Sequence, residues 1–142
     1  MKYYIGTDHA GINIKPYVIE LLEKKGYEVE DLGCYSTDRV DYPDFAHKVA
    51  EAVSKDENSK GILICGSGIG MSLAANKHPG IRAALCHDHY TAKMARLHND
   101  ANILCFGERI VAKGIIEDMI DVWCETEFEG GRHTDRVKKI EL

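Results

Sequence analysis

The stretch GILICGSGIG, residues 61–70, joins a short apolar run to a loop with glycine at every second position. The run Gly61 to Cys65 is typical of a strand that helices cover on both faces, as in parallel sheets. Glycines spaced this way let successive backbone N–H groups converge, and the helix expected after the loop adds its positive end. The stretch therefore predicts an α/β fold with an anion-binding loop after a central strand.

On both sides of this strand, apolar runs alternate with amphipathic stretches. Strands are expected at 3–6, 28–32, 61–65, 82–86 and 103–106. Helices are expected at 12–25, 43–54, from the glycine loop to about Lys77, from Asp88 to about His98, and at 112–126. This alternation predicts a three-layer α/β/α sandwich with a five-stranded parallel, Rossmann-like sheet and right-handed crossovers. The pattern does not indicate the strand order.

Length and charge narrow the class of protein. The 142 residues suit a single domain, 1–142, that ends in a basic C-terminal segment, 130–142. A net charge of −5 argues against a general nucleic-acid or acidic-membrane binder. No apolar stretch is long enough to cross a bilayer, and the first residues lead straight into a strand pattern rather than a signal peptide. Five cysteines without a C-x-x-C pair favour a reducing cytoplasm over a disulfide framework.

Ligands of such sheets bind beyond the carboxyl ends of the strands, which directs attention to Cys65 and its glycine loop. A dinucleotide fingerprint would need a third glycine where Met71 stands, and a Walker A loop would need G-K-[ST]. A cysteine-dependent phosphatase would need an arginine at 71, and a phospho-acceptor receiver domain an aspartate at 65. The interpretation that remains is a reactive thiolate beside an anion hole. Position alone favours a merely buried cysteine, and the glycine loop reverses that preference.

Several polar groups are candidates to share this site, and each has a simpler structural alternative. Asp8 and His9 could bind a sugar hydroxyl and a phosphate, or cap a helix. His98 could act as a general acid, or as a cation at a helix C-terminus. Arg132 and Arg136, four residues apart, could clamp a phosphate dianion, or belong to a solvated terminal helix. The triplet His87-Asp88-His89 could suggest a metal site, but a helix cap by Asp88 is a simpler interpretation.

Taken together, segments along the whole chain resemble the ribose 5-phosphate isomerase B family, which is similar to the galactose 6-phosphate isomerase subunits. The matching segments are Gly6-Thr-Asp-His-Ala-Gly11, Asp41-Tyr-Pro43, Gly61-Ile-Leu-Ile-Cys-Gly-Ser-Gly-Ile-Gly70, Ala74-Ala-Asn-Lys77, Gly80-Ile-Arg-Ala83, His98-Asn-Asp-Ala-Asn102, Phe106-Gly-Glu-Arg109 and Glu129-Gly-Gly-Arg-His133. Each is a modest signal, and their order along the chain makes the resemblance specific.

The resemblance implies a role for each matching residue in an aldose–ketose isomerase. Cys65 would remove the proton from C2, and the loop Gly66, Ser67, Gly68, Ile69 and Gly70 would stabilise the enediolate. His98 would assist opening of the furanose ring, helped by Ser67 and Asp8. The phosphate would bind His9, Arg132 and Arg136, with Arg109 and Asn99 also in the site. No cofactor or metal is expected.

The resemblance also implies homodimers, or tetramers of them, whose sites combine residues from two subunits. Many members of the family carry threonine where this chain has Ser67, which keeps the hydroxyl. Some relatives lack the cysteine and use a glutamate, so Cys65 places this chain with the cysteine-based members. The expected reaction interconverts ribose 5-phosphate and ribulose 5-phosphate in the non-oxidative pentose phosphate pathway. Two alternatives stay open: an isomerase of allose or galactose 6-phosphate, and a phosphosugar-binding module without turnover.

Overall fold

The computed structural model describes all 142 residues and confirms the predicted α/β fold. The strands are β1 (Lys2–Thr7), β2 (Glu28–Asp31), β3 (Ser59–Cys65), β4 (Ala83–Leu85) and β5 (Ile103–Gly107). The helices are α1 (Lys15–Lys24), α2 (Tyr42–Ser54), α3 (Ile69–Ala75), α4 (His89–Leu97), α5 (Lys113–Glu125) and α6 (His133–Lys138). Every neighbouring pair of strands is parallel, and their order is β2-β1-β3-β5-β4.

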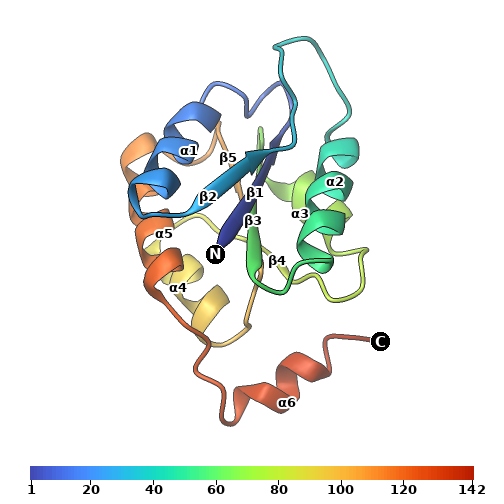
Figure 1. Cartoon of the computed structure of the whole chain (residues 1–142), viewed down its shortest axis with the longest axis vertical. Coiled ribbons are helices and arrows are strands. Elements are labelled where there is room, and N and C mark those ends of the chain that lie inside the picture. The colour runs from blue at the N-terminus through green and yellow to red at the C-terminus, as the bar shows by residue number, and fades with distance from the viewer.

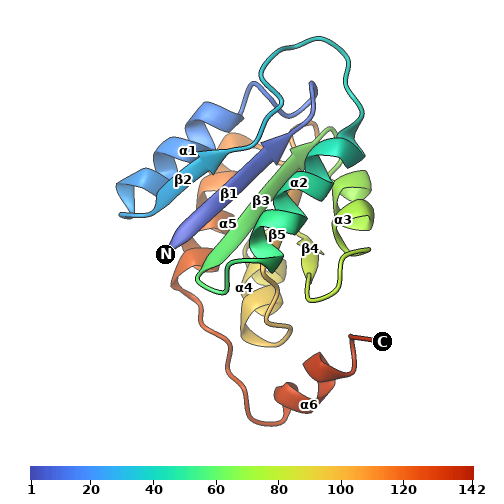
Figure 2. The same ribbon diagram turned by 45° about the vertical axis from the view of Figure 1, so that its right-hand side comes forward.

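Helices cover both faces of the sheet, as Figures 1 and 2 show. Helices α1, α4 and α5 pack on one face, and α2 and α3 pack together on the other. Side chains of β3 point alternately to the two faces of the sheet, and both faces are covered, which explains its continuous apolar run. Ile62 and Ile64 belong to the core between the sheet and helices α1, α4 and α5. Leu63 and Cys65 belong to the core between the sheet and helices α2 and α3. None of the helices combines the length and apolar character that crossing a membrane requires.

Two helix boundaries differ from the predicted ones, and the first has an identifiable reason. Helix α1 begins at Lys15 rather than at residue 12, because the Asp8 carboxylate accepts N–H groups of Ala10 and Gly11 and holds the preceding chain in turns. Pro16 then fits the first helical turn, where its missing N–H costs nothing. Helix α3 ends at Ala75, earlier than expected.

The start of α4 is as predicted. The Asp88 carboxylate accepts the Thr91 N–H at 2.8 Å, and the Thr91 hydroxyl oxygen accepts the Asp88 N–H at 3.3 Å. These two hydrogen bonds form a capping box. His89 pairs with Asp118 on α5 instead of joining a metal site, with Nδ1 3.1 Å from the carboxylate. The interpretation of this triplet as a helix cap is confirmed.

The short terminal helix α6 lies apart from the two main helical layers. After α5 the chain runs out to the amino ends of the strands, where α6 lies beneath the rest of the molecule in Figures 1 and 2. The Glu129 N–H donates to the Leu97 carbonyl at 3.0 Å, which ties this segment to the end of α4. The predicted basic segment is therefore helical, and it lies at the opposite end of the sheet from Cys65.

Candidate active site

The first group of predicted residues meets at the topological switch point of the sheet. Strands β1 and β3 are neighbours, and their following helices, α1 and α3, lie on opposite faces, so a crevice opens between their carboxyl ends. The Asp8 N–H donates to the Ile64 carbonyl at 3.2 Å and closes the floor of this crevice. A cavity of about 570 Å³ lies there, with the predicted Asp8, His9, Cys65, Gly66, Ser67, Ile69, Gly70 and Arg109 in its lining.

Cys65 lies at the base of this cavity as the last residue of β3. Its side chain is only 6% exposed, and its Sγ accepts the Gly68 N–H at 3.1 Å. The Cys65 carbonyl accepts the Glu108 N–H at 2.9 Å, so the loop after β5 fixes its backbone. The Gly68 N–H therefore holds the sulfur in place at the start of the glycine loop. Cys65 is therefore both the buried end of a strand and a residue of the cavity.

Gly68 can make this contact because it adopts a left-handed conformation, with φ of 81°. A Cβ at this position would lie 2.7 Å from Leu85 Cδ1 and 2.7 Å from the Phe106 carbonyl carbon. Glycine is thus required here both for the backbone angle and for the close approach of β5.

The loop also presents N–H groups that no atom of the chain accepts. The Ile69 N–H donates to the Ser67 hydroxyl at 3.2 Å, whereas the N–H groups of Gly66, Ser67 and Gly70 take part in no hydrogen bond within the chain. Free donors gathered around a partly enclosed cavity stabilise an anion. This geometry leaves the loop able to bind an anion, which stays a prediction.

Asp8 and His9 have clearly different environments. Asp8 is buried, and its Oδ1 accepts the Ala10 and Gly11 N–H groups at 2.8 and 3.1 Å, while Oδ2 has no partner. The His9 Nδ1 accepts the Val40 N–H at 3.2 Å. The neutral His9 ring therefore carries its proton on Nε2, as a donor for a ligand. Asp8 holds a turn rather than capping α1, and it keeps one oxygen for a ligand.

Arg109 supplies a positive charge beside the glycine loop. Its guanidinium lies against Gly66, where an added Cβ would meet Nη1 at 3.2 Å. No carboxylate pairs with it, and the side chain is exposed at the cavity. An unpaired guanidinium at this place suits an anionic ligand.

The other cysteines near the core differ from Cys65 in their environment. Burial raises the pKa of the Cys86 thiol to about 11 and that of Cys105 well above its usual value. Burial also raises the pKa of Cys124, which lies beside the Tyr3 hydroxyl on the far side of the sheet. These three remain thiols at neutral pH. The burial expected for Cys86 and Cys105 as strand residues is confirmed.

The second group of predicted residues lies at the amino ends of the strands. His98 is the C-cap of α4, and its ring stacks on His133 with centroids 4.2 Å apart. Arg132 directly precedes the first residue of α6, and Arg136 lies within the helix. Both side chains are exposed, and no carboxylate pairs with either. Burial, followed by the neighbouring His98, lowers the pKa of His133.

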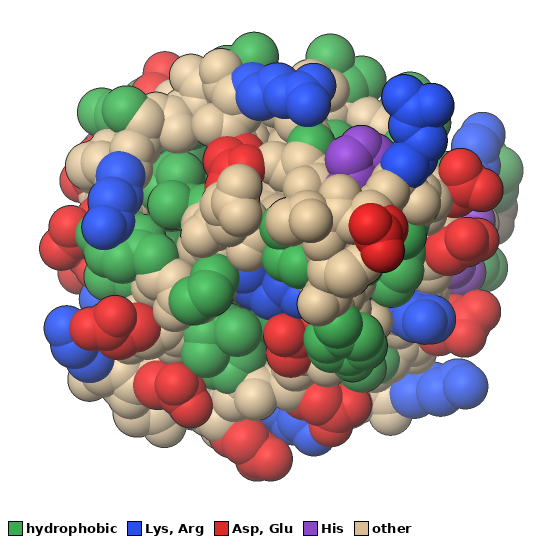
Figure 3. Space-filling view, turned by 90° about the horizontal axis from the view of Figure 1, so that it is seen from above, with side chains coloured by type: hydrophobic (Ala, Val, Ile, Leu, Met, Phe, Trp, Pro, Cys, Tyr) green, Lys and Arg blue, Asp and Glu red, His purple; other side chains and the backbone are tan.

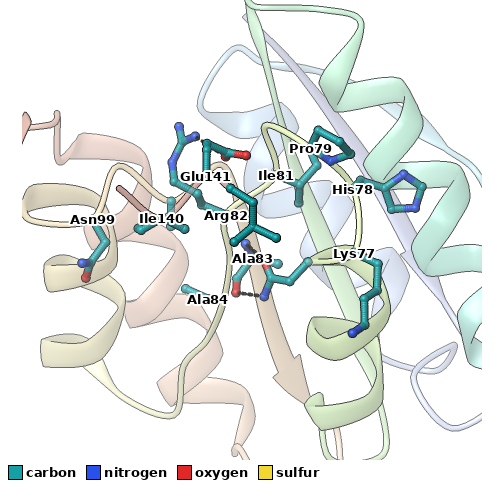
Figure 4. A pocket seen from close by; sticks show the side chains of 13 residues that line it. Lys77, His78, Pro79, Ile81, Arg82, Ala83, Ala84, Asn99, Ile140 and Glu141 are labelled. Carbon is teal, nitrogen blue, oxygen red and sulfur yellow. Dashed lines mark hydrogen bonds and ion pairs between the residues drawn. The ribbon is translucent and has the colours of Figure 1, made fainter. Parts of the chain in front are cut away.

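Asn99 lines a second cavity, of about 640 Å³, between the C-terminal tail and the turn after α3. Figure 4 shows Asn99 on one side of this cavity and Lys77 on the other, with Arg82 and Glu141 at its edge. The Asn76 amide bridges the N–H and carbonyl of Ala83 at its base, at 2.8 and 2.9 Å. One chain therefore holds the predicted site as two separate halves. We call them the Cys65 half, with Asp8, His9, residues 65–70 and Arg109, and the His98 half, with Asn99, Arg132 and Arg136.

The residue-by-residue reasoning missed three side chains that the structure adds to these halves. The Tyr42 ring lies on Gly70, where a Cβ would come within 2.4 Å of it. Glu129 and His133 accompany His98, with Glu129 Oε2 3.8 Å from His98 Nε2. All three stand in segments that match the family pattern, and that match was the available signal.

Comparisons with known proteins agree with this geometry. The family model described as Ribose/Galactose Isomerase matches residues 3–140. Ribose-5-phosphate isomerase B of Escherichia coli is 45% identical, over 98% of this chain and 93% of the relative. The structure of Clostridium thermocellum ribose-5-phosphate isomerase B superposes with a TM-score of 0.96 at 55% identity, covering 99% of this chain and 95% of that one. The Trypanosoma brucei type B enzyme superposes with a TM-score of 0.95 at 50% identity, covering 98% and 95%. The chain belongs to the ribose/galactose isomerase family.

Proposed function

We propose that this protein interconverts ribose 5-phosphate and ribulose 5-phosphate, the aldose–ketose step of the non-oxidative pentose phosphate pathway. The relatives named for this activity match nearly the whole chain at 45% and 55% identity. The observation that carries the proposal is the Cys65 sulfur in the cavity, paired with the Gly68 N–H at 3.1 Å. A base and a set of free N–H donors in one cavity are what enolisation of a sugar requires.

The reaction moves protons within the sugar, so substrate and product have the same composition. The Cys65 thiolate takes the C2 proton of the open-chain aldose, and the C2 electron pair forms the C1–C2 double bond while negative charge collects on the carbonyl oxygen. After a proton moves between the two oxygens, the Cys65 thiol returns its proton to C1 and gives the ketose. The free N–H groups of Gly66, Ser67 and Gly70 stabilise the enediolate oxygen. Each such donor contributes about 3–4 kcal/mol in comparable oxyanion holes.

Ring opening and phosphate binding need residues from both halves of the site. His98 transfers the proton that opens the furanose ring, with Ser67 and Asp8 holding the sugar hydroxyls. His9 and Arg109 from one half, and Arg132 and Arg136 from the other, bind the phosphate, with Asn99 on the sugar. The phosphate is remote from C1 and C2, so its binding energy positions the reacting carbons against the sulfur.

The two halves cannot meet within one chain. Strand β5 separates them, and its five residues span about 16 Å at the rise of a parallel strand. Proton transfer needs contact at about 3 Å. We therefore propose a homodimer, in which the His98 half of one subunit covers the Cys65 half of its partner.

The surface around Cys65 supports such a partner. Tyr42, Ile69, Leu73 and Ile110 line the cavity and are 40–63% exposed. Figure 3 looks onto this end of the molecule and shows hydrophobic side chains exposed beside basic ones and a histidine. A second subunit would bury these apolar side chains and exclude water from the enediolate.

Replacement of the base is the direct test. Cys65→Ala should abolish turnover of ribose 5-phosphate, whereas Cys124→Ala, the matched control on α5, should keep it. Circular dichroism of both variants checks the fold. Near-wild-type turnover by Cys65→Ala would refute the mechanism, and a survey of ribose, allose and galactose phosphates would identify the substrate.

The shared site has its own test. Cys65→Ala and His98→Gln proteins are each expected to be inactive alone. Unfolding and refolding them together should restore activity, because half of the dimers are mixed and each has one intact site, about a quarter of the wild-type value. No recovery, with mixed dimers shown by native mass spectrometry, would contradict the division of the site between subunits.

A further inference from the structure

The ring of His98, which opens the furanose in the proposed function, is held without hydrogen bonds. Neither ring nitrogen has a hydrogen-bond partner within the chain, and Nε2 lies 3.8 Å from Glu129 Oε2, which is too far for one. The ring instead stacks on His133, with centroids 4.2 Å apart and planes 17° from parallel. The His133 ring therefore lies against one face of His98 and limits its rotation.

His133 is the inner member of this stacked pair. Its side chain is 7% exposed, whereas that of His98 is 36% exposed. Residues 130–131, both glycine, have φ of 72° and 56° and turn the chain so that α6 starts with His133. The Leu97 carbonyl accepts the Glu129 N–H at 3.0 Å, which ties this turn to the residue before His98. The backbone thus fixes the inner ring, and the outer ring rests on it.

The nitrogens of His133 are not what the fold uses at this position. Its Nε2 is buried and has no hydrogen-bond partner, and Glu129 Oε2 lies 4.0 Å away. An unpaired buried nitrogen is unfavourable for stability, so a hydrogen bond does not explain this side chain. The face of the ring, stacked on His98, is the feature that makes a close contact.

Charge is divided unequally between the two rings. Burial, followed by the neighbouring His98, lowers the pKa of His133, and Arg132 and Arg136 act in the same direction against Glu129. Two imidazolium rings at 4.2 Å would repel each other, so the exposed ring of His98 takes up the first proton of the pair. A cation above the face of a neutral ring is a favourable arrangement.

We propose that His133 is a positioning residue for ring opening: its buried ring backs His98 and fixes the plane from which His98 transfers a proton to the furanose. This inference rests on the proposed function of His98, and it places His133 in no contact with the sugar. Proton transfer needs a donor and acceptor about 3 Å apart. A displacement of about 1 Å can lower a rate about 100-fold, so a loose His98 ring would be a poor donor.

Two variants of similar size separate the ring from mere filling of space. His133→Phe keeps an aromatic face, and His133→Leu removes it. We expect His133→Phe to keep kcat for ribose 5-phosphate within about threefold of wild type, and His133→Leu to lose about tenfold or more. KM should change little in either, because Arg132 and Arg136 stay in place. Equal kcat in the two variants, with native mass spectrometry and circular dichroism unchanged, would overturn the proposal.

Hydrogen exchange on ribulose 5-phosphate tests the Cys65 half separately. This ketose carries its phosphate on the hydroxyl that would close a furanose ring, so it reacts without ring opening. In D₂O, loss of its C1 proton signal reports enolisation by Cys65. His133→Leu should keep this exchange within about threefold of wild type, and His98→Gln gives the reference pattern for a protein that lacks only the ring-opening group. Exchange that falls in His133→Leu as far as turnover does would contradict a positioning role.

Histidine NMR gives a readout that needs no turnover. The Cε1–H signals of His98 and His133, assigned by their absence from His98→Gln and His133→Phe, should titrate in separate steps, with His98 protonated at the higher pH. In His133→Leu the His98 signal should move downfield, because shielding by the stacked ring is lost. An unchanged His98 signal would show that the rings do not stack in solution and would overturn the proposal. Absent turnover in the wild-type protein would instead contradict the proposed function, whatever these signals show.

Discussion

A pair of glycine-to-alanine substitutions tests how tightly the catalytic loop is built. Gly68 and Gly80 have nearly the same backbone angle, with φ of 81° and 80°. A Cβ on Gly80 would meet nothing within 4 Å, whereas one on Gly68 would lie 2.7 Å from the Phe106 carbonyl carbon. Both variants therefore carry the same left-handed strain, of about 1–2 kcal/mol, and only Gly68→Ala also overpacks the loop against β5.

Overpacking a well-packed site costs about 1–3 kcal/mol. Phe106 is a completely buried residue of β5, so its backbone cannot move aside cheaply. We expect Gly68→Ala to lose about 2–5 kcal/mol of unfolding free energy and Gly80→Ala about 1–2 kcal/mol. Urea unfolding at several protein concentrations measures both and separates dissociation from unfolding.

The same substitution should also act on catalysis. Displacing the Gly68 N–H from the Cys65 sulfur removes the contact that positions the base, so kcat for ribose 5-phosphate should fall by at least tenfold in Gly68→Ala. Gly80→Ala should keep wild-type turnover, because Gly80 lies at the other end of the sheet. If the two variants lose unfolding free energy equally, within about 0.5 kcal/mol, the close packing of Gly68 on β5 is wrong.

Three further predictions concern other parts of the chain. Asp88→Ala removes the cap of α4 and should lower the free energy of unfolding by about 1 kcal/mol, whereas Asp88→Asn should keep most of it in the same urea assay. Because the pKa of His133 is lowered in the folded protein, the unfolded chain binds a proton first as pH falls below about 6.5. The free energy of unfolding should therefore decrease from neutral pH toward the lowered pKa, and a His133→Gln protein with the same slope would contradict this. Iodoacetamide at neutral pH should modify Cys65 before Cys86, Cys105 and Cys124, and sugar phosphate should protect it; mass spectrometry that finds Cys86 modified first would contradict the assignment.

The fold could be predicted from the sequence because its signals are local. The apolar run 61–65 is buried on both faces, and the Asp88 cap acts within one helical turn. The start of α1 was predicted three residues too early, because the Asp8 carboxylate that binds the Ala10 and Gly11 N–H groups leaves no periodic signal. The strand order was not predicted either. It depends on which strands pair across the sheet, and residues in those pairs are distant in sequence.

The site shows the same limit more sharply. A thiol and a glycine loop adjacent in sequence must be adjacent in space, so the pairing of Cys65 with its loop could be predicted from the stretch 61–70 alone. Asp8, His9 and Arg109 join them because the ends of β1 and β5 lie beside the end of β3. His98 and the arginines of the α6 segment carry the expected chemistry. In a parallel α/β sheet, however, the carboxyl ends of the strands and the carboxyl ends of the helices lie at opposite ends of the sheet, so His98 lies far from Cys65. No pattern within one chain can then say how they reach the sulfur. The exposed apolar side chains around the cavity bear on this question, because burying them requires another molecule. In the homodimer that we propose, a second copy would add His98, Arg132 and Arg136 to the His9 and Arg109 that already line the cavity.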